Sequence, residues 1–335
     1  MSILTTQTIE YEAAATPFAF AAMNDSGDHT VFTTTNKPLS RADADPVIGG
    51  YGLITGGAVI PAVSATNSAV DTAAMELFAP GMTGASATTG KITIAADTDV
   101  ACTRGSTTNT HIINSITVDT SGAVAVVAGT ATTAFSETRA AAGGPPLIPV
   151  GSVEIAQVRF TSTAAAAVAS SEIYSAVGTH QERYDYPSST VDYLNGKLTF
   201  GAALPLIHTG PVAKRVYVRG STPIFSEIPN AKDWVPAETA DSTTSETNYT
   251  GTIAASISTT LNQASFTASM SDGVTDSILG RVGKRLIFRF KPSRNGTAYQ
   301  LTQGFLNKTR TFGVKANPVG SFTIAPDQAS VDFAS

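Results

Sequence analysis

The chain has 335 residues, of which 14% are charged, 7% are aromatic and 42% are hydrophobic. Charged residues usually make up about 25% of a soluble protein, and a low charge with abundant Ala, Thr and Val fits a β-rich chain that buries surface against copies of itself. The single cysteine, Cys102, excludes an intramolecular disulfide and a cysteine-only or Cys₂His₂ zinc site, and the net charge of −5 gives no reason to expect general nucleic-acid binding.

Charge is distributed unevenly along the chain. Residues 1–150 contain 5 basic and 12 acidic side chains, whereas residues 151–335 contain 16 and 14. Residues 281–315 contain nine basic residues and no acidic one. No apolar run reaches the ~18 residues of a membrane span, and no Lys or Arg precedes Lys37, as a signal peptide would need. We therefore expect a soluble protein that is made in a cytoplasm and has no membrane partner.

The N-terminal half is predicted to hold an arm followed by a small β domain. Residues 1–45 are polar and Thr-rich without a period, so we expect an extended arm that orders against something else. Residues 46–150 favour short strands between Gly, Ser and Thr turns, including a strand at 91–94 and a hairpin around Gly122.

A domain boundary is predicted at residues 141–149. Two glycines are followed there by three prolines within five residues, and such a run continues neither a helix nor a central strand. We expect three parts, with an arm at 1–45, an additional small β domain at 46–150 and a larger β domain at 151–335.

The larger domain begins with a strand at 153–160 and a short Ala-rich helix at 162–172. The clearest hairpin follows at 191–200, where Asn195-Gly196 fits a two-residue type I′ turn with two positive φ angles. A further strand is expected at 213–219, and the polar residues 234–248 predict a mobile loop.

The C-terminal third combines strands with one short helix. Residues 251–270 predict one or two strands, with Phe266, Ala268 and Met270 on one face, and residues 271–279 predict a capped helix. In the strand at 285–291 the apolar and basic residues alternate, so Leu286, Phe288 and Phe290 share the face opposite the basic side chains. The last strands are expected at 299–303, 310–315, 321–325 and 330–333.

The sequence predicts no catalytic, cofactor-binding or metal-ligating residues. The four histidines lie far apart, and Cys102 has no activating base near it in sequence, so a small buried residue is expected there. The densest polar cluster, at 180–187, offers His180, Glu182 and Asp185 as ligands or as an acid–base set. We favour a solvated loop or an interface for this cluster because no second group in sequence pairs with it.

The basic stretch at 281–315 leaves two interpretations open, a scattered solvated surface and an interface with acidic surface on a neighbouring copy. Nine positive charges without an acid would repel one another on an isolated subunit, which favours the interface. The predicted inter-subunit residues are Arg281, Arg285, Arg289, Lys291, Arg294 and Arg310.

From residue 280 to 333 the order is Gly-x-x-Gly, an alternating basic and apolar strand, Lys-Pro, a hairpin, Tyr-x-Leu-Thr-Gln-Gly, Arg-Thr-Phe and a closing Ser-Phe-Thr-Ile. This order resembles the C-terminal region of major tail tube proteins of long-tailed, siphovirus-like bacteriophages. The segments 145–160 and 184–187 also resemble phage tail proteins. Residues 46–150 depart from the family because a minimal tube subunit lacks them.

The resemblance implies a mainly β fold, a tail-tube-type β-sandwich or barrel with a short flanking helix, next to the additional domain as an outward decoration. It implies a structural virion protein that is not an enzyme, is made in the bacterial host cytoplasm and forms stacked hexameric rings. The tube would serve as the conduit for DNA ejection, with DNA passing transiently and without specific binding. Other tail proteins, such as the tape measure and the tail terminator, would be its partners.

The sequence leaves two functions open besides the structural one. Exposed aromatic residues suggest a carbohydrate- or surface-binding fibre or adhesin module, because such rings stack on sugars; the candidates are Tyr184, Tyr186, Tyr193 and Trp234. A virion-associated hydrolase ranks third, with Glu172, Glu182 and Asp185 as the acids to mutate.

Overall fold

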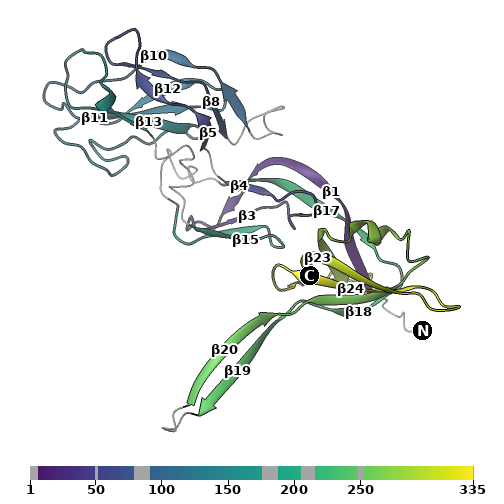
Figure 1. Ribbon diagram of the computed structural model, residues 1–335. Coiled ribbons are helices and arrows are strands. Elements are labelled where there is room, and N and C mark those ends of the chain that lie inside the picture. Colours follow the sequence, from purple (N-terminus) through teal and green to yellow (C-terminus); the bar gives the residue numbers. More distant parts are fainter. Residues whose placement is uncertain are drawn as a thin grey trace.

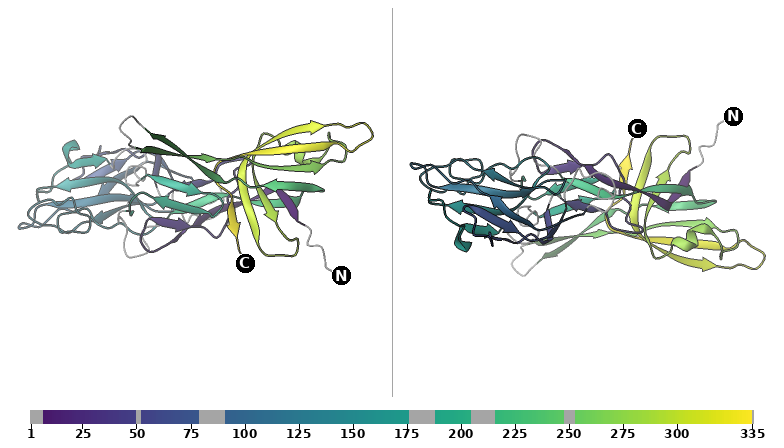
Figure 2. Two further views of the ribbon diagram at one scale, coloured as in Figure 1. Left: turned by 90° about the horizontal axis from the view of Figure 1, so that it is seen from below. Right: turned by 90° about the horizontal axis from the view of Figure 1, so that it is seen from above.

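The fold is mainly β, as predicted, with 51% of the residues in strands and 3% in helical turns. Antiparallel sheets follow one another along an elongated molecule (Figures 1 and 2). The residues that the computed structural model describes are 7–49, 52–78, 91–175, 188–204, 216–247 and 253–334.

The largest sheet has nine strands and is built from both ends of the sequence. Strand β1 (Thr8–Ala22) lies between β22 (Arg285–Lys291) and β17 (Tyr217–Glu227). The other strands of this sheet are β4 (Val47–Gly49), β18 (Ala231–Val235), β21 (Ala264–Ser269), β23 (Tyr299–Thr311), β24 (Val319–Pro326) and β25 (Val331–Phe333).

The position of β1 corrects the expected N-terminal arm. Residues 8–22 are extended, as predicted, but they pair with two strands of their own chain and do not wait for another partner. Ile9 and Tyr11 are buried in the core of the nine-stranded sheet. The local sequence of residues 8–22 does not show which distant strands it pairs with, because β17 and β22 lie about 200 residues or more further along the chain. This is why the sequence predicted an unpaired arm.

Successive side chains of β22 pack into two different cores, one on each face of the sheet. The sequence predicts the first of these faces correctly. Leu286 and Phe288 are fully buried, and Phe290 packs against the same core. Ile287 points to the opposite face, where it joins a second buried cluster with Leu194. The sheet is therefore covered on both faces at this strand.

A four-stranded sheet packs beside β1 and β17. It contains the predicted hairpin, formed by β15 (Ser189–Asp192) and β16 (Lys197–Phe200), together with β3 (Val31–Thr33) and β2 (Asn24–Asp25). Asp192 pairs with Lys197, so the connection has four residues instead of two. Only Gly196 in this turn has a positive φ, of 59°, which corrects the predicted type I′ turn.

Residues 52–78 and 91–175 form a cluster of three small sheets, called here the outer unit (Figure 1). Its core includes Ile116, Val158 and Phe160, all fully buried. The strands of this unit are β5 (Gly52–Gly56), β6 (Val59–Pro61), β7 (Ala69–Thr72), β8 (Met75–Phe78), β9 (Ile92–Ile94), β10 (Asp97–Ala101), β11 (Ile112–Val118), β12 (Val124–Ala128), β13 (Val153–Phe160) and β14 (Ile173–Ser175).

The extent of the outer unit corrects the predicted boundary at residue 150. Strand β11 pairs with β13 from Ile112 opposite Phe160 to Val118 opposite Val153, so the Gly- and Pro-rich segment is a loop inside one sheet. Gly and Pro end a strand, but they do not show whether the next strand returns to the same sheet. The additional domain therefore runs to residue 175, and the predicted larger domain loses its first strand to it.

Both predicted short helices are corrected, because the described residues contain only two short 3₁₀ segments, η1 (Ser170–Glu172) and η2 (Ser277–Arg281). In the Ala-rich stretch, the carbonyl oxygens of residues 162 and 166 accept hydrogen bonds from Arg104 at 3.1 and 3.0 Å. Between 271 and 276, the Asp276 carboxylate accepts the N–H groups of Ser271 and Gly273. Such side-chain bonds to the backbone compete with a helix.

Candidate assembly surfaces and pocket

A long hairpin projects from the body of the molecule (Figure 1). It consists of β19 (Thr239–Thr247) and β20 (Ile253–Leu261), which pair without a register shift from Thr239 opposite Leu261 to Thr247 opposite Ile253. Within the described part of the chain, neither strand pairs with a third. This hairpin replaces the mobile loop predicted at 234–248.

The base of the hairpin is fixed to the nine-stranded sheet. Asn262 N–H donates to the Glu238 carbonyl at 2.9 Å, which closes the two strands. Ala237 is fully buried, and its backbone exchanges hydrogen bonds with Ser330 at 2.9 and 2.7 Å. A two-stranded ribbon in water is marginally stable at best, so an anchored ribbon with two open edges is suited to accept a further strand.

The hairpin is less protected against pairing with another chain than edge strand β18 is. Edge strand β18 has a bulge between Lys232 and Val235, and Asp233 has a positive φ of 59°. Bulges and charged side chains discourage pairing with another chain. Residues 239–247 include the acids Asp241 and Glu246, whereas residues 253–261 contain no charged residue and no Pro. The β20 edge therefore lacks these safeguards, and the pairing of β19 with β20 has no bulge.

Five of the six predicted interface residues of the basic stretch have acidic partners within the chain. Arg285 Nε lies 2.7 Å from Asp327, and Arg281 lies 3.9 Å from Asp43. Asp43 also accepts a hydrogen bond from Lys284 at 2.8 Å. This bond is the largest cause that lowers the pKa of the Asp43 carboxyl below its ordinary value.

The other predicted basic residues are also partnered within the chain, three by acids and Arg310 by a backbone carbonyl. Glu10 on β1 pairs with Arg289 and lies 3.8 Å from Lys291. Arg294 pairs with Glu227. Arg310 donates to the carbonyl of residue 273. Acids on β1 and β17, at residues 43–45 and just after β24 therefore offset much of the charge of the basic stretch within one chain, and acids of a neighbouring copy are not required for this.

A buried carboxylate fastens the segment at 40–45 to the sheet. Glu12 is fully buried, its Oε1 accepts the hydroxyl of Ser40, and its Oε2 accepts the N–H of Ile287 at 3.1 Å. Burial is the largest cause acting on the pKa of Glu12 and raises it above the ordinary value, while the two hydrogen bonds oppose the shift. Glu12 thus joins β1, β22 and this segment.

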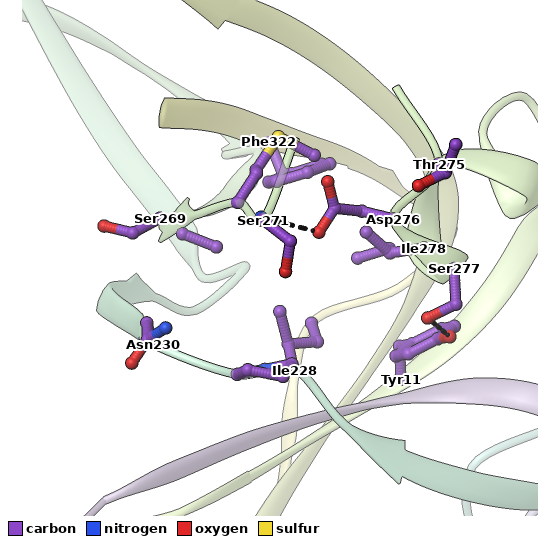
Figure 3. Close-up of a pocket in the computed structure, with 13 residues that line it drawn as sticks. Tyr11, Ile228, Asn230, Ser269, Ser271, Thr275, Asp276, Ser277, Ile278 and Phe322 are labelled. Carbon is purple, nitrogen blue, oxygen red and sulfur yellow. Dashed lines mark hydrogen bonds between the residues drawn. The ribbon is translucent and has the colours of Figure 1, made fainter. Parts of the chain in front are cut away.

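The pocket shown in Figure 3 has a volume of about 290 Å³ and lies between residues 228–230, the end of β21 and the loop before η2. Tyr11 Oη donates to Ser277 Oγ at 2.9 Å, and Ser271 N–H donates to Asp276 at 2.9 Å. Its apolar lining consists of Ile228, Ala268, Met270, Ile278 and Phe322. These polar groups are hydrogen-bonded within the wall, so the arrangement offers apolar packing space and no assembled reacting group among the described residues.

The aromatic residues considered for sugar stacking are engaged with their own chain where the structure describes them. Trp234 stacks on Phe290 with ring centroids 5.7 Å apart and donates its indole N–H to Gln300 at 2.9 Å. The guanidinium of Arg41 lies 4.1 Å from the centre of the Tyr193 ring. Tyr184 and Tyr186 lie outside the described residues. The structure therefore does not favour a stacking platform at Trp234 or Tyr193.

The residues considered for catalysis are not brought together in the described part of the chain. Glu172 accepts the N–H of Ala169 at 2.8 Å and lies 3.9 Å from Arg104. His180, Glu182 and Asp185 lie outside the described residues.

Cys102 is buried, as predicted, and burial raises the pKa of its thiol to about 12. A thiol with such a pKa stays protonated at neutral pH and is a poor nucleophile.

Searches of the residues described in the structure found no group of three His, Cys, Asp or Glu side chains placed to hold a metal ion. None of the helical segments described is long and apolar enough to cross a membrane. The sequence matches no known protein family, no curated protein and no solved structure at a significant level.

Proposed function

We propose that this chain is a structural subunit that assembles with copies of itself, of the kind that forms the tail tube of long-tailed bacteriophages. In that function, subunits form hexameric rings that stack into the conduit for DNA ejection, and the outer unit decorates the outside. The tape measure and tail terminator proteins are the proposed further partners, and the virion tail is the proposed location.

The observation that carries the proposal is the projecting hairpin of β19 and β20. Nine residue pairs are held in register, the base is anchored, and both edges of the ribbon are open in the described structure. Pairing with a strand of a second copy would satisfy the unpaired backbone groups, and main-chain hydrogen bonds give such strand addition its affinity. The low charge of the chain suits a large contact between copies.

The test compares the whole chain with a variant that lacks the hairpin. Residues 239–261 are replaced by Asn-Gly, because Glu238 and Asn262 already lie within hydrogen-bond distance of one another. Asp241→Asn serves as the matched control, since it changes a hairpin side chain and keeps the strand. Sedimentation velocity across a concentration series and electron microscopy report assembly, and urea unfolding reports whether each variant is folded.

The wild-type chain and Asp241→Asn are expected to form rings or tubes as concentration rises, whereas the shortened chain stays monomeric with a folded body. A wild-type chain that stays monomeric at all concentrations would refute self-assembly. Assembly of the shortened chain at wild-type concentrations would instead refute the role of the hairpin.

A further inference from the structure

The turn between β23 and β24 carries an exposed apolar group at the end of the molecule opposite the outer unit (Figure 2). Val314 is 91% exposed and Phe312 is 57% exposed; Val274, in the loop before η2, is 67% exposed. Contact between the two loops is close, since a Cβ on Gly273 would lie 2.9 Å from the Phe312 ring. These residues, with Val319, are called the apolar tip.

The apolar tip also carries charged side chains. Lys308, Arg310 and Lys315 come from β23 and the turn after it, and Asp272 and Asp276 flank Val274 in the other loop. Both acids accept backbone N–H groups of their own loop, whereas neither lysine has an ion-pair partner within the described residues. Large exposed apolar side chains gathered in one place mark an interaction surface more often than scattered ones do. The partner that fits such a surface is apolar and acidic.

The outer unit presents a surface of that kind on its β6–β7–β10 sheet. Val63 is 83% exposed and Ile60 is 47% exposed. Asp97 and Asp99 are exposed on β10, and Ser64, next to Val63, donates its hydroxyl to Asp99. Residues 59–72 and 97–101 contain acids and no Lys or Arg. These residues are called the acidic patch.

The charge of the acidic patch is not neutralised by the basic residues of its own unit. Each of the four basic side chains between residues 52 and 175 already pairs with another acid. The pairs are Lys91 with Glu76, Arg104 with Glu172, Arg139 with Glu154 and Arg159 with Glu137. Asp97 and Asp99 are exposed, so they are free to pair with a cation from another chain.

We propose that the apolar tip of one copy docks on the acidic patch of a second copy, head to tail. The tip lies on the turn between β23 and β24, whereas the patch lies on the sheet of β10 in the outer unit, so they do not meet within one chain (Figure 1). Because the two surfaces differ, the contact is heterologous and extends from copy to copy until it closes into a ring or continues as a filament. This contact rests on the proposed self-assembly, and it names surfaces other than the hairpin.

Cysteine cross-linking tests the contact directly. Val314→Cys and Val63→Cys chains are mixed and oxidised, with native Cys102 protected by its burial. A disulfide-linked dimer is expected in the mixture and not in either chain alone. A dimer formed by Val314→Cys alone would show tip-to-tip contact and overturn the proposal.

Charge exchange tests the same contact without a covalent bond. Lys308→Glu with Lys315→Glu is expected to weaken assembly by about tenfold or more, since like charges would then face one another. Adding Asp97→Lys to that chain is expected to restore most of the loss. Lys37→Glu, an exposed lysine outside the tip, is the matched control and should leave assembly unchanged.

Each remaining outcome separates this proposal from the proposed function. A wild-type chain that assembles while the mixed cysteines do not cross-link overturns the docking and leaves self-assembly standing. A wild-type chain that never assembles overturns both. A membrane is the other possible occupant of the tip. If the wild-type chain binds vesicles of anionic lipid, a Phe312→Ser, Val314→Ser chain does not, and the cysteine mixture does not cross-link, the tip binds a membrane and the docking is overturned.

Discussion

Replacing Glu12 with alanine is expected to destabilise the nine-stranded sheet, whereas replacing it with glutamine is not. The fully buried carboxylate accepts the Ser40 hydroxyl and the Ile287 N–H, the latter at 3.1 Å. Glutamine can keep both contacts, because its amide oxygen accepts from Ile287 and its amide nitrogen donates to the Ser40 hydroxyl oxygen. Alanine can keep neither.

The expected size of the loss follows from the donor that alanine leaves without an acceptor. A buried N–H without a partner costs about 1–3 kcal/mol, so Glu12→Ala should lower the free energy of unfolding by at least about that amount. The removed side chain also leaves space beside Ser40, which adds to the loss. Urea unfolding followed by tryptophan fluorescence measures it, since Trp234 packs against the same core.

The glutamine variant should show a pH-dependent gain over the wild-type chain. Burial raises the pKa of Glu12 in the folded state above its value of about 4.5 in the unfolded state, so the folded chain favours the protonated form. This contribution to stability is fully present below the unfolded-state pKa and is lost as pH rises through the folded-state pKa. The free energy of unfolding of Glu12→Gln, minus that of the wild-type chain, should therefore rise as pH increases from the unfolded-state pKa of Glu12 to its folded-state pKa.

The variant is compared with the wild-type chain at the same pH, so the pH dependence that other groups contribute to stability largely cancels. Asp43 is one such group, and its lowered pKa acts in the opposite direction. Two results would refute the reasoning. One is a Glu12→Ala chain as stable as wild type, and the other is a difference between Glu12→Gln and wild type that does not change with pH.

Three further predictions concern packing and reactivity. Gly304→Ala should destabilise the chain by about 1–3 kcal/mol, because a Cβ at this β23 position would collide with the Ala325 carbonyl oxygen on β24. Urea unfolding measures this loss, and an unchanged free energy of unfolding would contradict the close approach. Cys102 should react with a thiol reagent at pH 8 only after unfolding, because burial raises its pKa to about 12; rapid labelling of the folded chain would contradict this. Trp234→Phe should cost about 0.5–1.5 kcal/mol through loss of the 2.9 Å bond to Gln300, and an unchanged unfolding midpoint would count against that bond.

Short-range patterns in the sequence predict the strands and several of their connections. Apolar residues at every second position of 285–291 identify the buried face of β22, because successive side chains of a strand point to opposite faces. The hairpins around Gly122 and Gly196 form where predicted, since a positive φ is required within the turn itself. These features depend on neighbours a few residues apart.

Pairings between distant segments were decided by the tertiary structure. The sequence does not show that β1 enters the sheet between β17 and β22, or that β13 returns to β11 across a Gly- and Pro-rich loop. The basic stretch is a similar case, because Glu10 and Asp43 meet it from more than 200 residues away. Local composition reports the charge of a segment, and only the folded chain shows which charge lies opposite.

The projecting hairpin lies between these two cases. Its Thr and Ser residues suit both a polar loop and a solvated strand, so local composition does not decide between them. In the structure nine residue pairs are in register, above a base at which Ala237 and Asn262 are held by hydrogen bonds. The sequence by itself therefore determined that the chain is built of strands, while the fold decided which strands are joined and which edges are left open, because backbone pairing depends on position in space and not on the identity of the side chains.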